Sequence, residues 1–217
     1  RFGTVGPAFD GIEVKIADDG EILVRGPNVF LGYYKEPDAT AETLVDGWLH
    51  SGDLGSFDAD GFLSITGRKK EIIVTAGGKN VAPATLEDPI RSNTIIGQVI
   101  VVGDQKPFIS ALITLDEEML PAWLSNNGIT GVSVDQARSH PAVLAEVQRA
   151  IDAANDRVSR AESIRKFAIL DSELTEASGH LTPKLSIKRH IIVQDFADVI
   201  DGLYSGSPAT EGVSVQG

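Results

Sequence analysis

Apolar and polar residues alternate one by one near the start of the chain. Residues 12–16 show this period of two, the next four residues, Ala-Asp-Asp-Gly, are typical of a tight turn, and the largely apolar residues 21–25 run back as a second strand. The pattern therefore predicts a β-hairpin. It also predicts a short helix over 37–44 and, after a second turn rich in Asp and Gly, a strand over 62–66. This part of the chain is expected to be β-rich.

A second pattern, in which apolar residues lie three and four positions apart, begins later in the chain. It is clearest over 139–164, where Leu144, Val147 and Ile151 recur at helical spacing and Pro141 lies near the expected helix start. The other predicted helices are 84–92 and 116–126, and the predicted strands are 71–74, 98–102, 108–115 and 167–170. Helices and strands are therefore mixed here.

These elements predict an α+β fold in two parts. Residues 1–67 form a β-rich part, and residues 68–70 mark the join. Residues 71–204 form a small mixed α/β domain, with a β-hairpin and a short mixed sheet flanked by helices. Residues 205–217 are rich in Gly, Ser and Ala, and we expect a disordered tail there.

The composition excludes several classes of protein. A content of 42% hydrophobic and 23% charged residues is usual for a folded globular protein. The absence of cysteine excludes a disulfide scaffold, a thiol catalyst and a Cys-ligated metal site. No apolar run approaches the roughly 18 residues of a membrane span, so no transmembrane segment is expected. The chain opens on Arg1 and its one methionine is Met119, from which we expect a fragment of a longer protein.

The net charge of −12 makes nucleic acid an unexpected partner, because an acidic chain repels a polyanion. The basic residues are nonetheless grouped, at 68–70, 157–166 and 184–189. We interpret the group at 157–166 as the solvated end of the predicted helix 139–164, where cations also suit the helix dipole. The other two groups are small, which favours sites for a small anion.

Two motifs lie at or near the predicted join. In residues 51–53 (Ser-Gly-Asp) a carboxylate follows a Gly turn, which suits hydrogen bonding to the vicinal hydroxyls of a ribose. An Asp that only forms a turn is the alternative. In residues 67–70 (Gly-Arg-Lys-Lys) a flexible Gly precedes three cations, which suits a phosphate contact or a hinge. An ordinary solvated charge run is the alternative.

Two further motifs follow. Residues 77–79 (Gly-Gly-Lys) would let the backbone approach a ligand closely, although they lack the spacing of a P-loop and a plain hairpin turn is the alternative. Residues 181–189 (Leu-Thr-Pro-Lys-Leu-Ser-Ile-Lys-Arg) place cations on a Pro-stiffened loop. A lysine there could bring a point charge to a developing oxyanion or phosphate, and a merely solvated basic loop is the alternative.

In this order and spacing, the four motifs resemble those of the adenylate-forming enzymes. Residues 26–34 and 46–53 are similar to a further motif of that family. The spacing of the middle motifs is carried by Gly67, Arg68, Lys70, Ile73, Gly77, Val81, Pro83 and Glu87. Over residues 3–204, the chain resembles the C-terminal third of a long-chain fatty acyl-CoA synthetase, which is an AMP-forming acid–thiol ligase.

The resemblance implies a reaction in two halves, in which a fatty acid and ATP form an acyl-adenylate and the acyl group then passes to coenzyme A. Asp53 would hydrogen-bond the ribose hydroxyls, and Arg68 would contact the same nucleotide. Lys188 would be the catalytic lysine that reaches the substrate carboxylate and the α-phosphate. Electrostatic stabilisation of this kind suits a reaction between two anions.

The resemblance also implies a domain that moves between the half-reactions. Lys70 would be the hinge, 71–204 the mobile C-terminal domain, and 1–67 the β-rich end of the N-terminal adenylate-forming domain. The loop that lines the route of the CoA thiol in the second half-reaction would consist of Gly77, Gly78 and Lys79. The rest of the N-terminal domain is the expected partner of this chain.

ATP and coenzyme A are therefore expected as substrates, together with a fatty acid. Mg²⁺ is expected too, but its ligand would lie outside this chain, and no metal ligand is assigned within it. The expected location is the cytoplasm, with peripheral membrane contact left open. Because the phosphate loop, the adenine-binding segment and the acyl tunnel are not among these residues, we expect the isolated chain not to activate fatty acids.

The chain departs from the family pattern at two positions. Ile187 stands where a Gly often precedes the lysine, and Thr85 stands where a Glu is common, whereas Glu87 is kept. Two alternatives stay open for the function. One is a related AMP-forming ligase, such as an aryl-CoA ligase, a fatty acyl-AMP ligase or a peptide-synthetase adenylation domain. The other is a non-catalytic module that docks coenzyme A or a carrier protein.

Overall fold

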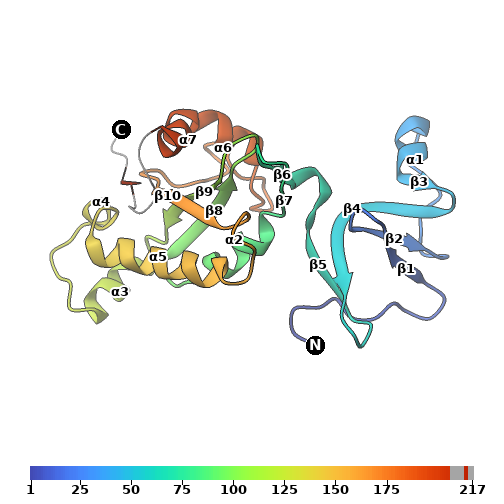
Figure 1. The fold of residues 1–217 in the computed structure, drawn as a ribbon, viewed down its shortest axis with the longest axis horizontal. Helices are drawn as coiled ribbons and strands as arrows, with labels where there is room; N and C mark the ends of the chain where they lie inside the picture. Colours follow the sequence, from blue (N-terminus) through green and yellow to red (C-terminus); the bar gives the residue numbers. More distant parts are fainter. Residues whose placement is uncertain (206–212, 215–217) are drawn as a thin grey trace. The chain divides into compact units, whose positions relative to one another are not determined.

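The computed structural model describes residues 1–205 and 213–214, and the chain divides into two compact units (Figure 1). The first unit is residues 1–72 and the second is residues 73–217. The division follows shortly after the predicted join at 68–70, which itself stays a prediction. Each unit is described by itself below.

The first unit is built on an antiparallel sheet in which β1, β2, β4 and β3 lie in that order and β5 also pairs with β4. Its elements are β1 (Glu13–Ile16), β2 (Glu21–Arg25), α1 (Pro37–Thr43), β3 (Leu44–Val45), β4 (Trp48–Phe57), β5 (Leu63–Arg68) and the 3-10 helix η1 (Lys69–Glu71). Strands β1 and β2 confirm the predicted hairpin, with Glu13 opposite Arg25 and Ile16 opposite Ile22. Helix α1 and strand β5 confirm two more predictions.

The sheet of the first unit covers only a small buried core. Its buried apolar side chains are Ile22, Leu23 and Leu54. Large apolar side chains elsewhere in the unit are exposed to solvent, namely Phe2, Val5, Phe9, Phe30, Leu31, Tyr33, Tyr34, Val45, Phe57 and Ile65. This unit therefore buries little of its own apolar surface.

The second unit is a mixed sheet covered by helices. Strand β9 pairs antiparallel with β8 and parallel with β10, which in turn pairs parallel with β11. Its elements are β6 (Ile73–Val74), β7 (Asn80–Val81), α2 (Ala84–Arg91), β8 (Ile96–Val102), β9 (Ile109–Leu115), α3 (Leu120–Asn126), α4 (Val134–Ala137), α5 (Pro141–Asn155), β10 (Ile164–Ile169), α6 (Arg189–Asp195), α7 (Ala197–Tyr204) and β11 (Val213–Ser214). The predicted α+β class is confirmed.

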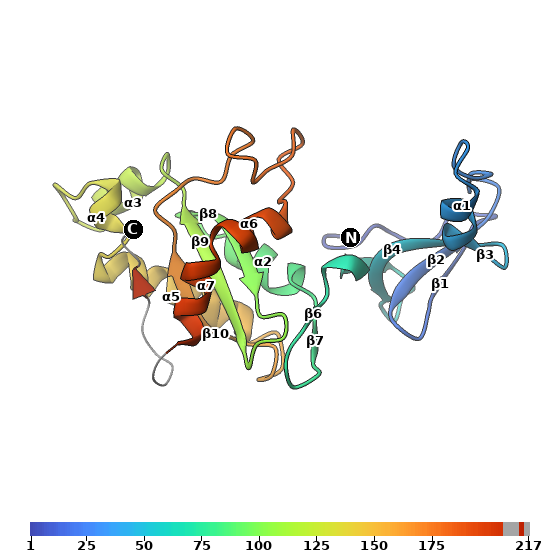
Figure 2. The same ribbon diagram turned by 90° about the horizontal axis from the view of Figure 1, so that it is seen from above.

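Helices cover both faces of the β8–β9–β10 sheet (Figures 1 and 2). Along β8, Val99 and Val101 belong to the core cluster beneath α2 and α5, whereas Ile100 and Val102 belong to the cluster beneath α6 and α7. This period of two is expected for a strand buried on both faces. The second unit is therefore a three-layer domain with a complete core of its own.

Two of the predicted helices are too long. The pattern predicted a helix over 139–164, but α5 ends at Asn155, whose side chain donates to the carbonyl of Ile164 and accepts from its N–H (3.0 and 2.8 Å). Val158 packs against the core from a turn rather than a helix, so the apolar spacing continued past the helix end. The helix predicted over 116–126 begins only at Leu120, as α3.

The shorter α5 also changes the interpretation of the charges at 157–166. Arg157 and Arg160 lie in turns after the helix, and Arg165 and Lys166 lie on β10, so these residues do not form a helix end.

Helices α6 and α7 were not predicted. Of the predicted tail, residues 206–212 and 215–217 lie outside the described residues. None of the helices in residues 1–205 combines the length and apolar character that a membrane crossing requires.

Candidate functional site

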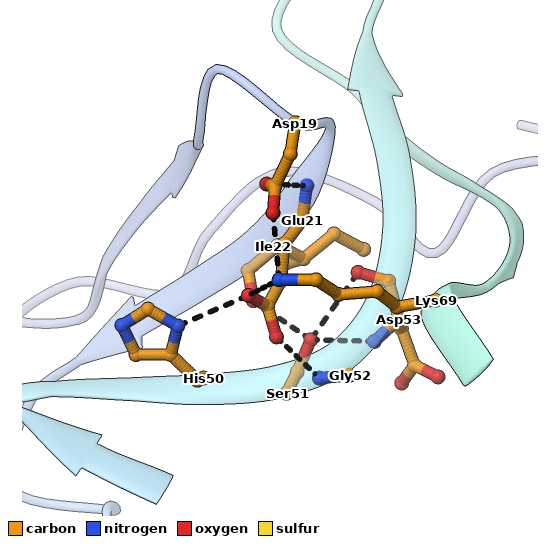
Figure 3. A network of polar contacts seen from close by, with 8 residues as sticks. All are labelled: Asp19, Glu21, Ile22, His50, Ser51, Gly52, Asp53 and Lys69. Atoms are coloured by element: carbon orange, nitrogen blue, oxygen red, sulfur yellow. Dashed lines mark hydrogen bonds and ion pairs between the residues drawn. The ribbon is translucent and has the colours of Figure 1, made fainter. Parts of the chain in front are cut away.

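A buried carboxylate organises the first unit next to the Ser-Gly-Asp motif (Figure 3). Glu21, at the start of β2, accepts hydrogen bonds from Nδ1 of His50 (3.0 Å), from the N–H of Gly52 (2.9 Å) and from Nζ of Lys69 (2.9 Å). Nζ of Lys69 also pairs with Asp19 at 2.6 Å. Gly52 lies within β4 and not in the predicted turn: its φ of +73°, which glycine adopts without steric cost, falls where the register of β2 and β4 shifts, and its N–H is presented to Glu21.

Glu21 is ionised in this network. Burial acts to raise the pKa of Glu21, but the hydrogen bonds from Lys69, His50 and Gly52 outweigh it and hold the pKa below the ordinary glutamate value. The hydrogen bond to Asp19, followed by that to Glu21, raises the pKa of Lys69. Lys69 is therefore a fixed cation bound to the β1–β2 hairpin.

Asp53 and Arg68, the two predicted nucleotide-binding residues, lie opposite each other on paired strands. They are Cα partners between β4 and β5, and Nε of Arg68 lies 3.0 Å from Oδ1 of Asp53. The hydroxyl of Ser51 donates to the carbonyl of Ile22 (2.7 Å) and accepts from the N–H of Asp53 (3.1 Å), which stabilises the irregular stretch of β4 around Gly52. The structure thus brings these two predicted residues together on a braced strand pair.

A pocket of about 390 Å³ opens in this unit beside the network. Gly52, Arg68 and Lys70 line it, whereas Asp53 is not among its lining residues. The other lining residues are Glu21, Tyr33, Glu42, Thr43, His50, Ser51 and Lys69. Cationic side chains that can meet a phosphate thus border the same hollow as the predicted ribose-binding turn.

Lys70, the predicted hinge, lies exposed in η1 shortly before the second unit begins at Ile73. Its neighbour Lys69 is bound to Asp19 and Glu21, whereas Lys70 forms no ion pair with any residue that the structure describes. A fixed residue followed by an unrestrained one is compatible with a hinge at Lys70.

The predicted CoA-side loop is the exposed turn between β6 and β7. Gly78 has a φ of +77° and donates its N–H to the carbonyl of Thr75 (2.8 Å), and the N–H of Lys79 donates to Oγ1 of Thr75 (3.1 Å). The Lys79 ammonium pairs with Glu162 at 3.1 Å, beyond the end of α5. Gly77, Gly78 and Lys79 thus form a tight hairpin turn, and the ion pair with Glu162 holds the Lys79 side chain.

Lys188 lies at the base of a second hairpin-like loop, as the N-cap residue of α6. Leu181 and Ile187 form a β-bridge, and the N–H of Lys188 donates to the carbonyl of His180 at 2.8 Å. Leu185, at the tip, is exposed and has a φ of +61°. The half-buried Lys188 forms no ion pair within the described residues. Its backbone is held while its ammonium is left for another partner.

Arg189, the next residue, belongs to a buried ion pair. One terminal nitrogen of Arg189 lies 2.8 and 3.0 Å from the two carboxylate oxygens of Glu87 on α2. Glu87 also accepts the N–H of Val101 (2.8 Å), and Arg189 donates to the carbonyl of Val101 (2.8 Å). Burial raises the pKa of Glu87, although Arg189 and the Val101 N–H oppose this.

Sequence reasoning missed most of these buried polar contacts. No alternation marked Glu21 as an inward residue, because residues 21–23 of β2 are all buried. Glu87 was noted only as part of a motif, without its partner Arg189. His180 was missed altogether: its ring lies 2.8 Å from Oγ of Ser178 and 3.0 Å from Oδ2 of Asp195.

The family described as "AMP-binding enzyme C-terminal domain" matches residues 70–208, and the chain belongs to this family. Over 206 residues it is 53% identical to the long-chain-fatty-acid–CoA ligase FadD15 of Mycobacterium tuberculosis, an alignment that covers 94% of this chain and 34% of FadD15. It is 33% identical over 241 residues to the long-chain-fatty-acid–CoA ligase ACSBG1 of Bos taurus, covering 100% of this chain and 33% of ACSBG1. The chain spans about a third of the length of these relatives.

The fold also matches part of a solved enzyme. O-succinylbenzoate coenzyme A synthetase (MenE) from Bacillus subtilis, in complex with AMP, matches with a TM-score of 0.62 and 23% identity, covering 97% of this chain and 37% of MenE. The predicted resemblance is confirmed: the chain is similar to the C-terminal third of fatty acid–CoA ligases.

Proposed function

We propose that this chain is the C-terminal part of an AMP-forming ligase that activates a long-chain fatty acid with ATP and passes the acyl group to coenzyme A. Its family membership and its similarity to fatty acid–CoA ligases support the class of reaction. The structural observation that carries the proposal is Lys188, whose backbone is held at a loop base while its ammonium meets no carboxylate among the described residues. A cation so placed suits an incoming anion.

In the first half-reaction, a carboxylate oxygen of the fatty acid attacks the α-phosphorus of ATP. The bond from that phosphorus to the bridging oxygen breaks, and pyrophosphate leaves. Asp53 would hydrogen-bond the ribose hydroxyls, and Arg68 would contact the same nucleotide. Because the reacting groups are both anionic, the ammonium of Lys188 would lower the barrier by offsetting charge that gathers around the phosphorus.

In the second half-reaction, the thiolate sulfur of coenzyme A attacks the acyl carbonyl carbon, and AMP leaves with the electron pair of the broken C–O bond. Rotation of the second unit about Lys70 would withdraw Lys188 and bring up the Gly77-Gly78-Lys79 loop. A Cβ added at Gly78 would meet no atom within 4 Å, so this turn has open space beside it. That space would border the route of the thiol.

Mg²⁺ accompanies ATP in this proposal. Its ligands would lie in a part of the protein outside this chain, as the resemblance to the adenylate-forming enzymes implies. We place the reaction in the cytoplasm, where ATP and coenzyme A are both available. Peripheral contact with a membrane is compatible with this location.

The proposal is tested by incubating the full-length protein that carries this chain with a long-chain fatty acid, ATP, Mg²⁺ and coenzyme A. We expect acyl-CoA, AMP and pyrophosphate in equal amounts, and acyl-adenylate when coenzyme A is omitted. Formation of ADP and phosphate, or no acyl product with any fatty acid, would contradict the proposal.

A substitution at the nucleotide side sharpens this test. Asp53→Ala should lower kcat/KM for ATP about 10- to 100-fold, since a hydrogen bond to a charged group contributes roughly 1.5–3 kcal/mol. Asp10→Ala, which removes an exposed carboxylate from the same unit, is the matched control and should leave kcat/KM unchanged. Equal effects of the two substitutions on kcat/KM would show that Asp53 does not bind the nucleotide.

A further inference from the structure

We infer that the buried ion pair between Glu87 and Arg189 is a positioning device for Lys188. The inference rests on the proposed function, in which Lys188 is the catalytic residue. Neither Glu87 nor Arg189 contacts substrate in this scheme. They act through the backbone, because Arg189 follows Lys188 directly in the chain.

The pair is largely buried, and within the described residues Nε is the one guanidinium nitrogen of Arg189 that is buried without a hydrogen-bond partner. The Glu87 side chain is 6% exposed and the Arg189 side chain 19% exposed. Burying both charges is costly unless each finds a partner, and here each finds two: the other charge, and a backbone group of Val101 on β8. A network of this kind holds one geometry, because any displacement of the guanidinium leaves charge unpaired in the interior.

Lys188 is also held from its other side. Its N–H donates to the carbonyl of His180 (2.8 Å), and the His180 ring is fixed between Ser178 and Asp195. Ile187, which stands where the family often has glycine, packs against the core cluster beneath α6 and α7. Three contacts therefore hold the backbone around Lys188: the hydrogen bond to His180, the packing of Ile187 and the ion pair of Arg189. The Lys188 ammonium forms no ion pair within the described residues.

The same pair ties Lys188 to the element that follows the CoA-side loop. Glu87 lies on α2, which begins a few residues after Gly78, and the stem of that loop is held by the buried Ile73 and Val81. The CoA-side loop is thus anchored in the cluster beneath α2 and α5, and the Lys188 loop in the cluster beneath α6 and α7, and the ion pair joins the two faces of the sheet. Rotation of the whole second unit, as in the proposed function, would carry both loops together.

The experiment measures the two half-reactions separately in the full-length protein. Fatty-acid-dependent ATP–pyrophosphate exchange reports adenylation, and thioester formation from supplied acyl-adenylate reports the CoA step. Arg189→Lys and Glu87→Gln should each slow exchange about 10- to 100-fold, because lysine and glutamine cannot reproduce the charged contact and a misplacement near 1 Å costs on the order of 10² in rate. Thioester formation should stay within about twofold of the parent protein.

Three controls make the result decisive. Lys188→Ala shows the loss expected when the catalytic group itself is missing. Arg138→Lys is the matched control, since the Arg138 side chain is 13% exposed and pairs with Glu117 and Asp135 in the same unit. The double variant Glu87→Met/Arg189→Met replaces the ion pair by an apolar pair, which keeps the core filled if the single variants unfold. It should show the same selective loss of exchange.

The outcomes separate this inference from the proposed function. If Lys188→Ala leaves exchange intact, the proposed function is wrong whatever the pair does. If Lys188→Ala abolishes exchange but the Glu87 and Arg189 variants keep the ratio of the two half-reactions seen with Arg138→Lys, the positioning role is wrong. Equal loss of both half-reactions together with a lower Tm indicates a purely structural pair and also overturns the inference.

Discussion

The two units bury apolar surface to very different extents. The second unit packs two core clusters on the two faces of one sheet, whereas the first buries Ile22, Leu23 and Leu54 and exposes Phe2, Leu31 and other large side chains. The second unit thus has a core of its own on each face of its sheet, whereas the first leaves most of its large apolar side chains exposed.

The units also treat a buried carboxylate in opposite ways. The pKa of Glu21 is lowered in the first unit, because a lysine, a histidine and a backbone N–H outweigh burial. The pKa of Glu87 is raised in the second unit, because burial outweighs Arg189, the N–H of Val101 and the more distant Arg91. The contacts of Glu21 thus favour the charged form of that carboxyl, whereas the burial of Glu87 disfavours its charged form.

The largest expected effect on stability comes from the core of the second unit. Leu112→Ala removes a fully buried side chain from β9 and should lower the free energy of unfolding by about 2–5 kcal/mol. Leu31→Ala removes a fully exposed side chain from the first unit and should change it by less than about 0.5 kcal/mol. Similar losses at the two positions would contradict the contrast in burial.

Each unit carries one tryptophan, which allows their unfolding to be followed separately. Trp48 lies on β4 and Trp123 on α3, so Trp123→Phe leaves a reporter on the first unit and Trp48→Phe leaves one on the second. Urea titrations monitored by fluorescence should show the Leu112→Ala effect only through Trp123.

The next effect is a pH dependence of the first unit. Because the folded pKa of Glu21 lies below the ordinary value of about 4.5, its contribution to stability is present above that value and is lost as pH falls through the folded pKa. The Trp48 signal should therefore report declining stability below about pH 4.5. Glu21→Gln should cost about 1–2 kcal/mol at pH 7 and flatten this decline. An unchanged acid profile would show that Glu21 is not the group responsible.

The smallest expected effect is at Lys79. Its ion pair with Glu162 is partly exposed, so Lys79→Met should change the free energy of unfolding by no more than about 0.5 kcal/mol. Thermal unfolding of the second unit checks this. A loss comparable to that of Leu112→Ala would mean that the loop is part of the core and not a surface turn.

Local patterns predicted more of the fold than of the site. The hairpin formed by β1 and β2 follows from alternation and a turn within a few residues, and both were visible in the sequence. The end of α5 was not, because the apolar spacing continues to Val158 while the side chain of Asn155 turns back to bond Ile164. Periodicity records which side chains face the core and not where the backbone stops being helical.

The site was predictable only as separate motifs. Asp53 and Arg68 could be named from the sequence, and the structure adds that they lie opposite each other on β4 and β5. Glu87 and Arg189 come from distant parts of the chain, and no local signal joins them. Tertiary packing decides which charged side chains are buried together, so this pairing required the fold.

The most direct measurement is the effect of Lys188→Ala on the two half-reactions of the full-length protein. Fatty-acid-dependent ATP–pyrophosphate exchange should fall about 10²–10³-fold, as for the loss of a group that stabilises developing charge. Thioester formation from supplied acyl-adenylate should change by less than about threefold. Lys184→Ala, which removes an exposed lysine from the same loop, should leave both unchanged. Exchange that survives Lys188→Ala would contradict the account.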